Sequence, residues 1–503
     1  MFTKHPRPNC HGRFRPAARV ATIVLVLARF AAAAPTAADP HIAAVESGLL
    51  PPARIAGRAS EPWTLASRMA HYRVPGVSIA VIDNGQITWS RGYGVARSGE
   101  SAPVSPDTLF QAASLSKMLT AAAALTLVDA GRLALDTDVN PQLKSWKIPA
   151  SPLADGETIT LRRLLSHTAG FNVHGFSGYA ASAPIPTLLQ VLDGSAPANS
   201  EPIRVVAKPG AGWRYSGGGY CVVQQLLTDV TGEPFPALLH DRVLNRAGMD
   251  ASTFAQPLPA NLAARAAAGH DADGQRIPGD ARVYPELAAA GLWTTPTDLA
   301  HFILALHHSI AATGGPALLS PATAKAMITP PLAGSDYGLG LGVIGAGRNL
   351  QLTHSGANAG FRALLVFYPQ LDRGAVIMTN SENGAPLATE ILRAIAQTYD
   401  WPDYRVEEKS AFPLAPEAFD AFAGRYERED TILVFYSRGD RFYLRATNRP
   451  RVEIFPSSDH QFFMLGSPDT FDFERAASGE TTHVIRRTPT GAQLFPRIER
   501  PSD

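Results

Sequence analysis

Apolar residues between positions 60 and 400 follow strand-like and helix-like spacings in turn. Residues 77–82 form a nearly continuous apolar run of strand length. Asp83-Asn84-Gly85 follows this run and is a hairpin turn signal, because Asn-Gly tolerates the positive φ angles of a tight turn. Residues 87–89 would be the return strand, and two further strands are predicted at 363–368 and 375–379.

Between these strands the apolar spacing is helical. A long helix is predicted over 114–129, ended by Gly131 at a C-cap position. Helical patterns recur at 220–231, 236–247, 297–308 and 385–399. Strands at both ends of a helical middle predict an α+β domain. Its antiparallel sheet would be completed by both ends of the segment and flanked by helices, beside an all-helical region.

The last hundred residues have a different pattern. Short runs rich in aromatic and β-branched residues alternate with Gly, Pro, Ser and Asp, which is typical of antiparallel strands. These runs are 442–444, 452–455, 462–465 and 471–473. The preceding segment, 400–416, is rich in Pro and charge and is interpreted as a linker. Residues 417–503 are therefore predicted to form a small β-barrel or β-sandwich domain.

The N-terminus has the pattern of a secretory signal peptide. Residues 1–38 hold six Lys/Arg and no Asp or Glu, with an apolar run at 20–27 and small residues at 31–38. Cleavage after Ala38 would leave no transmembrane anchor and a secreted or periplasmic protein. An Arg-rich organelle presequence is the alternative. The resulting division is a signal peptide (1–38), a main domain (39–402), a linker (403–416) and a C-terminal domain (417–503).

The charge balance argues against a nucleic-acid partner. The whole chain has a formal net charge of +1. Without the six basic residues of the leader, 39 Lys/Arg face 44 Asp/Glu, a net charge of −5. Nucleic-acid binding needs a concentrated basic face, which this balance does not favour.

Cysteine and histidine spacing predicts neither disulfide nor metal. Only Cys221 would remain after signal cleavage, and it lies in an apolar helical pattern typical of a core residue. No His/Cys cluster has zinc spacing, and His-Glu-x-x-His is absent from the sequence. The expected site therefore uses no metal and no cofactor.

Ser114-Leu115-Ser116-Lys117 is the first segment with candidate chemistry. In a helix that begins at Ser114, residues i and i+3 lie on one face, so Lys117 would lie beside the Ser114 hydroxyl. A serine hydroxyl is a poor nucleophile until a base removes its proton, and a buried lysine can be that base. The motif alone is weak, since Ser-x-x-Lys occurs by chance about once in a chain of this size.

Two further segments carry polar groups next to small residues. In the first, Tyr215 precedes Ser216-Gly217-Gly218-Gly219 at a predicted helix start, where its phenol could relay protons near a lysine. Taken alone, it is better explained as a loop tyrosine. In the second, His354-Ser355-Gly356-Ala357, the small residues would let a substrate lie against a strand edge. The Ala357 N–H could pair with that of Ser114 as an oxyanion hole, and His354 could bind the tyrosine or a substrate carboxylate. A satisfied surface histidine is the alternative.

Together, these segments resemble the serine β-lactamase and penicillin-binding-protein superfamily. Ser-x-x-Lys, a Tyr-x-x turn about 100 residues later and His-x-Gly near the domain end occur in the order of that superfamily. The match is to its class C-like branch, which includes D-aminopeptidases, D-Ala carboxypeptidases and esterases. Segments 164–170, 290–299 and 337–340 resemble the same branch, and the C-terminal β segment resembles the lipocalin-like appendage of some members.

The resemblance implies roles for named residues. Ser114 would be the acylated nucleophile, Lys117 its base partner and Tyr215 the proton shuttle, while His354, Gly356 and Ala357 would form the substrate-edge strand and oxyanion hole. Two positions depart from the branch.

Gly217 stands where an Asn amide is usual, and His354 stands where β-lactamases usually have Lys. A histidine is not a permanent cation at neutral pH, so recognition of a substrate carboxylate is weakened. Both departures favour an esterase or peptidase over a β-lactamase.

Other functions can be ranked below this one. A Gly-x-Ser-x-Gly elbow is absent, which argues against an α/β-hydrolase. Residues 340–345 match a dinucleotide-binding pattern, but no helix pattern follows them, so the match is attributed to chance.

The sequence therefore predicts a secreted serine hydrolase that forms an acyl-enzyme with a small peptide, amide or ester substrate. A peptidoglycan-derived peptide is one candidate. The alternatives are a β-lactamase and a catalytically weak cell-wall or ligand-binding module.

Overall fold

The computed structural model describes residue 12 and residues 39–58, 62–312, 318–447, 451–489 and 491–498. The chain divides into two units, residues 1–39 and 40–503. Apart from Gly12, the expected signal peptide lies outside the described residues. The description below concerns the second unit.

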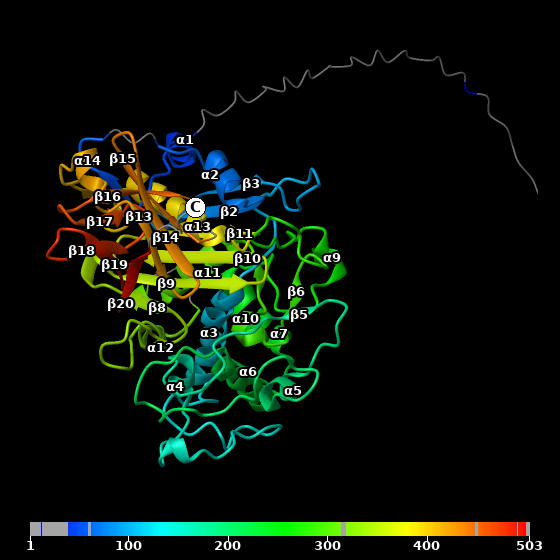
Figure 1. The fold of residues 1–503 in the computed structure, drawn as a ribbon. Helices are drawn as coiled ribbons and strands as arrows, with labels where there is room; N and C mark the ends of the chain where they lie inside the picture. The colour runs from blue at the N-terminus through cyan, green and yellow to red at the C-terminus, as the bar shows by residue number, and fades with distance from the viewer. Residues whose placement is uncertain are drawn as a thin grey trace, which may run out of the picture. The chain divides into compact units, whose positions relative to one another are not determined.

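A six-stranded antiparallel sheet is the central element of this unit (Figure 1). β2 pairs with β3 on one side and with β11 on the other, so an early and a late segment of the main domain share one sheet. This confirms the predicted α+β architecture. In spatial order the strands are β3 (Gln86–Gly94), β2 (Gly76–Asp83), β11 (Arg373–Thr379), β10 (Phe361–Tyr368), β9 (Gln351–Asn358) and β8 (Gly342–Ile344).

The apolar run of β2 is continuous because both faces of the sheet are covered. Val77 and Ile79 belong to one core cluster, whereas Ala80 and Ile82 belong to another. Alternate side chains point to opposite faces of a strand, so each cluster takes every second residue. α1 (Pro40–Ser47), α2 (Leu65–Tyr72) and α13 (Gly384–Thr398) contribute to the first cluster; α3 (Ser116–Asp129) and α11 (Pro296–Ala311) contribute to the second.

The predicted hairpin turn is confirmed. Asn84 and Gly85 connect β2 to β3 with φ angles of +51° and +70°. Positive φ at both central positions matches the right-handed twist of the two strands.

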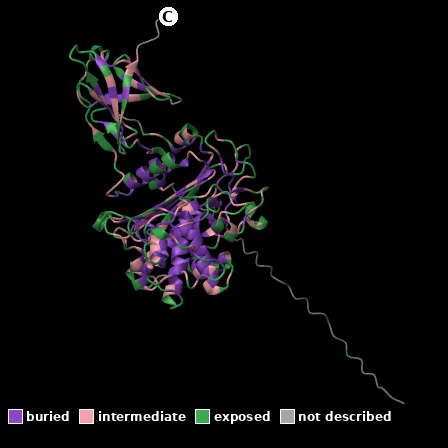
Figure 2. Ribbon diagram, turned by 60° about the horizontal axis from the view of Figure 1, so that its bottom comes forward, coloured by how far each residue is buried: buried purple, intermediate pink, exposed green. Residues whose placement is uncertain are grey.

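The helical region surrounds α3, in which twelve of 14 residues are buried. A helix that is apolar on all sides lies inside a domain, as the buried residues in Figure 2 illustrate. The pattern at 236–247 is not one α-helix but α7, a π-helical turn (His240–Leu244) and α8. The other elements of this region are α4 (Leu161–Leu165), α5 (Leu188–Asp193), α6 (Gly217–Thr231), α7 (Phe235–Leu239), α8 (Asn245–Ala247), α9 (Ala260–Ala263), α10 (Leu287–Ala290), α12 (Pro321–Met327) and the strand pairs β4 (Phe110–Gln111) with β7 (Trp293–Thr294) and β5 (Tyr179–Ala180) with β6 (Arg282–Val283).

The C-terminal segment is a closed eight-stranded antiparallel barrel, which decides between the predicted barrel and sandwich. Its interior is filled by aromatic side chains, including Phe419 and Phe422 beside the short helix α14 (Pro416–Phe419). The four runs seen in the sequence became β15 to β18. The strands are β13 (Gly424–Arg428), β14 (Thr431–Arg438), β15 (Arg441–Ala446), β16 (Val452–Pro456), β17 (Gln461–Met464), β18 (Thr470–Arg475), β19 (Thr481–Thr488) and β20 (Gly491–Ile498).

The segment interpreted as a linker contains a strand. β12 (Glu407–Lys409) pairs in parallel with β1 (Ala53–Ile55). Pro and charge made this segment look irregular, but three residues of strand pairing need only a partner edge, which the distant β1 supplies.

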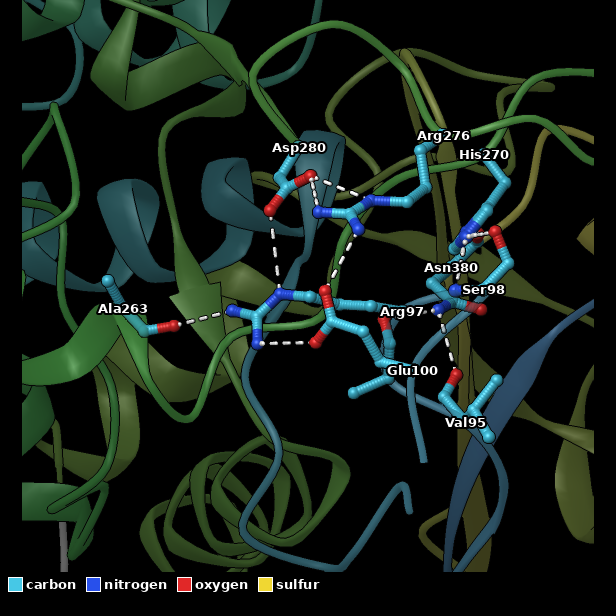
Figure 3. Close-up of polar contacts among 10 residues, drawn as sticks. Val95, Arg97, Ser98, Glu100, Ala263, His270, Arg276, Asp280 and Asn380 are labelled. Carbon is cyan, nitrogen blue, oxygen red and sulfur yellow. Dashed lines mark hydrogen bonds and ion pairs between the residues drawn. The ribbon is translucent and has the colours of Figure 1, made fainter. Parts of the chain in front are cut away.

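An ionic network holds the loop after β3 against the segment before β6 (Figure 3). Arg97 lies 3.4 Å from Asp280, and Arg276 bridges Asp280 (2.6 Å) and Glu100 (2.9 Å). The same segment pairs at Ala266 with Leu109, immediately before β4. The network therefore helps to fix the strand that leads to Ser114.

Among the described helices, none combines the length and apolar character that a membrane span requires.

Candidate active site

Ser114 lies in a tight turn, not in the first turn of an α-helix. Ala113–Leu115 form a 3-10 turn, and α3 begins at Ser116, which corrects the expected helix start. Ala113 has a φ of +51°, which is a left-handed conformation. Because a right-handed helix does not contain this conformation, the chain cannot pass from β4 directly into an α-helix at this residue. Because the 3-10 turn runs directly into α3, Ser114 and Lys117 still lie on one side.

Hydrogen bonds from the 289–294 segment hold this turn in place. Ser116 Oγ donates to the Ala113 carbonyl (2.6 Å) and accepts from the Leu292 N–H (3.0 Å). The Ala112 N–H donates to the Leu292 carbonyl, and β4 pairs with β7 just before it. The nucleophile candidate is thus fixed by backbone contacts that were not visible in the sequence.

Lys117 contacts Ser114 directly. Its Nζ donates to Ser114 Oγ at 3.1 Å and to the Ala289 carbonyl at 2.8 Å, and its side chain is 2% exposed. The ring centres of Tyr215 and Tyr220 lie 5.0 and 5.7 Å from Nζ. Within the described part of the chain, no carboxylate forms an ion pair with this amine. The sequence-based pairing of Ser114 with Lys117 therefore exists as a hydrogen bond.

Tyr215 reaches the same place from the turn before α6. Ser216 is the N-cap of α6, and its side chain accepts from the Gly219 N–H. Tyr215 is half-buried, and its ring centre lies 4.2 Å from that of His167 and 4.8 Å from that of His174. The predicted position at a helix start is confirmed.

His354 is buried, which excludes the surface-histidine alternative. Its Nε2 accepts from Tyr337 Oη at 3.0 Å and its Nδ1 donates to the Ser355 carbonyl at 2.7 Å, so its partner is Tyr337 and not Tyr215. Burial, followed by the charge of Lys117, lowers the pKa of His354 to about 3. The third motif therefore presents a neutral imidazole near neutral pH.

Gly356 lies against the turn that carries Ser114. A Cβ at this position would collide with the carbonyl oxygen of Ala112. The missing side chain lets β9 pass close to the Ser114 turn.

Ala357 faces the cavity beside Ser114. β8 pairs only with residues 351–353 of β9, so the later half of β9 has β10 as its one strand partner among the described strands. This unpaired edge offers backbone N–H and C=O groups to a ligand.

A loop closes the space beside Gly217, the position at which the family branch named above usually has an Asn amide. A Cβ on Gly217 would lie 3.0 Å from Phe176 Cε2 and 3.1 Å from the carbonyl oxygen of His174, to which the Gly217 N–H donates. The loop containing His174 and Phe176 therefore fills the space that a larger side chain at position 217 would need.

The candidate residues surround a cavity of about 1110 Å³. Its walls are largely aromatic and polar, Arg214 is the one charged residue among the lining residues, and Trp213 is 48% exposed there. The lining residues are Ser114, residues 172–177, Trp213, Arg214, Tyr215, Tyr337, Gly342, Thr353, His354, Ser355, Ala357 and Leu364. A cavity of this size admits a substrate larger than a simple ester.

Several residues in or next to the cavity lining were missed in the sequence. Tyr337 and His167 lie in segments noted for their resemblance but were given no role, while the loop 172–177 was not noted at all. The signal available for this loop was the run His174-Gly175-Phe176, which follows shortly after Gly170. Gly217, in contrast, does not line the cavity described above.

No group of three or more His, Cys, Asp or Glu residues in the described chain is placed to hold a metal ion. Cys221 is buried, and burial raises the pKa of its thiol well above its usual value. It is a core residue.

The chain is similar to known proteins over most of its length. The Beta-lactamase family model matches residues 64–400. The chain is 23% identical to "Penicillin-binding protein 4*" of Bacillus subtilis, over 77% of this chain and 87% of that protein. It is 28% identical to "Penicillin-binding protein 4" of Amycolatopsis lactamdurans, over 72% of this chain and 96% of that protein.

Two further similarities extend the comparison. "Unguisins hydrolase ungD" of Aspergillus violaceofuscus is 29% identical over 62% of this chain, and the chain spans 59% of the length of that hydrolase. The fold resembles that of the octameric penicillin-binding protein homologue from Pyrococcus abyssi, with a TM-score of 0.60 and 21% identity over 86% of this chain and 98% of that one. A family match over more than half of the sequence, with this fold, shows that the chain belongs to the Beta-lactamase family.

Proposed function

We propose that this protein is a serine acyl hydrolase that works through an acyl-enzyme on Ser114. The observation that carries the proposal is the 3.1 Å hydrogen bond between Lys117 Nζ and Ser114 Oγ, on a strained turn at the wall of a large cavity. A nucleophile and a base within hydrogen-bond reach are the minimum that acyl transfer needs.

The acylation step follows from these positions. In its unprotonated form, the Lys117 amine takes the proton of Ser114 Oγ, and Oγ attacks the substrate carbonyl to form a tetrahedral oxyanion. The backbone N–H groups of Ser114 and Ala357 stabilise that oxyanion. As it collapses, the bond to the leaving group breaks, and the proton held by Lys117 passes to the leaving group through the Tyr215 phenol.

Deacylation reverses the roles. Water attacks the acyl carbonyl after giving a proton to the Tyr215–Lys117 pair, and that proton returns to Ser114 Oγ as the acid product leaves. No metal or further reactant is required.

The walls of the cavity favour an ester or peptide over a β-lactam. Neutral His354 supplies no cation for a substrate carboxylate, and Gly217 supplies no amide. Exposed Trp213 and the nearby Phe176 favour substrates with an apolar or aromatic acyl group. Esterase or D-amino-acid peptidase activity is therefore proposed as the main reaction.

A turnover panel on the full chain tests this proposal. It would contain p-nitrophenyl esters of increasing acyl size, D-Ala-D-Ala peptides, D-aminoacyl amides and a chromogenic cephalosporin. Labelling with a fluorophosphonate and with a labelled penicillin, followed by peptide mass mapping, would locate the adduct. We expect ester turnover and a Ser114 adduct.

An unmodified Ser114 under both reagents, with no turnover of any substrate, would overturn the hydrolase proposal. That result would favour the alternative of a ligand-binding module, for which the absent amide at Gly217 is the supporting observation.

A further inference from the structure

His167 holds the backbone on both sides of Tyr215. Its carbonyl oxygen accepts from the Arg214 N–H at 2.8 Å, and its ring Nδ1 accepts from the Ser216 N–H at 3.1 Å. Tyr215 lies between these two donors. One residue thus holds a backbone N–H on each side of the tyrosine.

The conformation of His167 makes this double contact available. Its φ is +60°, in the left-handed region that few non-glycine residues adopt. Such a conformation is unfavourable for a residue with a side chain and is found mainly where a site requires it. Here it lets the carbonyl group and the imidazole of a single residue reach the same turn.

The imidazole also supports the phenol directly. Its ring centre lies 4.2 Å from that of Tyr215 at an interplanar angle of 38°, and 4.9 Å from that of Tyr337. The side chain of His167 is 2% exposed. The Tyr215 ring therefore packs against the buried imidazole of His167.

The hydrogen bond from Ser216 also sets the tautomer. Because Nδ1 accepts, the neutral ring carries its proton on Nε2. That Nε2 is buried and has no hydrogen-bond partner among the residues that the structure describes. Burial, followed by the charge of Lys117, lowers the pKa of His167 well below its usual value, so the ring stays neutral and Nδ1 stays an acceptor.

We infer that His167 is a positioning residue of the acyl-transfer site: by holding the Arg214 and Ser216 amides, it keeps the Tyr215 phenol beside Lys117. This inference rests on the role proposed for Tyr215. A competing role is direct proton donation from Nε2 to the reacting groups. The two roles use different nitrogen atoms and can be separated by substitution.

Two variants separate them. In His167→Asn, the amide oxygen can replace Nδ1 as acceptor, and asparagine tolerates the left-handed conformation. In His167→Gln, the amide reaches toward the place of Nε2 and leaves Ser216 without its acceptor. If His167 positions Tyr215, the Asn variant keeps function and the Gln variant loses it.

The readouts are kcat and KM for a p-nitrophenyl ester, with active sites counted by fluorophosphonate labelling of Ser114. We expect His167→Gln to lower kcat by about 10- to 100-fold with little change in KM, as a misplaced catalytic group does. His167→Asn should stay within about threefold of the parent. His270→Asn is the matched control, because His270 is also buried and hydrogen-bonded, to the Asn380 carbonyl, but lies away from the cavity lining. It should lower the melting temperature without lowering kcat per active site.

A second measurement does not depend on activity. Hydrogen exchange of the peptide containing Arg214 and Ser216, in the full chain, should be faster in His167→Gln and unchanged in His167→Asn. Equal kcat losses in both variants, or retention of kcat in the Gln variant alone, would overturn the inference. If the parent enzyme fails to acylate Ser114, the proposed function fails, whereas the exchange experiment still decides whether His167 holds the turn.

Discussion

Lys117 Nζ donates one hydrogen bond to Ser114 Oγ and another to the carbonyl oxygen of Ala289. The second bond ties the amine to α10 and therefore restricts the motion of the long Lys117 side chain. Since proton transfer requires a fixed geometry, this double contact orients the amine toward Ser114.

Removing the amine of Lys117 should abolish acylation. Lys117→Met keeps most of the side-chain volume, while Lys117→Ala also removes the stem. We expect both to lower the rate of Ser114 acylation by about 10²- to 10⁴-fold, the usual contribution of a general base. Rapid-quench mass spectrometry of the acyl-enzyme measures this rate. Lys325→Ala, at an exposed position on α12, is the control, and unchanged acylation in Lys117→Met would contradict the assignment.

Gly217 should not accept an asparagine unless the loop opposite it gives way. The new Cβ would press on Phe176 and on the carbonyl group of His174. We expect Gly217→Asn to lose about 1–3 kcal/mol of stability, as overpacked positions do. Combining it with Phe176→Ala should recover part of this loss, since the end of a side chain is removed but the carbonyl group remains.

Urea unfolding measures these changes. Gly219→Ala is the matched control, because the atom nearest to its Cβ, on Leu164, would be 3.7 Å away, an ordinary van der Waals distance. Hydrolysis of a chromogenic cephalosporin can be followed in the same samples. Faster cephalosporin hydrolysis in Gly217→Asn, without the Phe176→Ala substitution, would show that the loop does not close the space beside position 217.

His354 should make the protein lose stability in acid. Its pKa is lowered to about 3 in the folded state and is about 6.5 in the unfolded chain. Above pH 6.5 neither state binds the proton. As the pH falls below 6.5, only the unfolded state takes it up, so the free energy of unfolding falls until about pH 3. His354→Gln should reduce this acid-dependent loss by up to about 3 kcal/mol at pH 4.

Chemical denaturation at pH 7, 5.5 and 4 checks the prediction for His354. Tyr337→Phe is the control, since it removes the hydrogen-bond donor to His354 but leaves the titrating group. That variant should be less stable at every pH and keep the acid-dependent loss. A parallel acid dependence in His354→Gln and the parent would refute the assignment.

Glu286 should act in the opposite direction. Its carboxylate is fully buried, no other described residue donates a hydrogen bond to either oxygen, and desolvation raises its pKa to about 7. Below pH 4.5 both states are protonated. Between pH 4.5 and 7 only the unfolded state ionises, so the folded state loses stability as the pH rises.

Neutral substitutions at Glu286 should therefore stabilise the protein at pH 8, by up to about 3 kcal/mol, and have no such effect at pH 4. Thermal unfolding of Glu286→Gln and Glu286→Met at both pH values measures this. Both variants remove the charge, and the Met variant also removes the unpaired polar atoms. A stabilisation that is the same at pH 4 and pH 8 would contradict the predicted ionisation.

The C-terminal barrel should be dispensable for turnover. Its aromatic interior forms a core cluster separate from the two clusters on either side of the sheet. A chain ending after Ser410 keeps β12 and the contacts of Asp403 with Gln351 and Tyr368, whereas a chain ending at Pro402 loses them. We expect the longer chain to retain kcat and the shorter one to melt at a lower temperature. Loss of kcat in the longer chain would show that the barrel shapes the site.

The sequence by itself determined several elements of the fold and the pairing of Ser114 with Lys117. The apolar run of β2 and the Asn84-Gly85 turn rest on local backbone preferences, which act within a few residues. The spacing of Ser114 and Lys117 is also local, because three residues along a helical turn return to the same side. Four barrel strands were visible for the same reason.

Only the tertiary structure decided how the site is closed and held. Three features of the site depend on segments up to about 240 residues apart in the sequence. They are the strained backbone at Ala113, the contact of Gly356 with Ala112 and the packing of a loop against Gly217. Burial by distant elements, and not local sequence, makes His354 neutral and gives it Tyr337 as a partner. Desolvation and close packing depend on which surfaces meet, and a linear pattern does not contain that information.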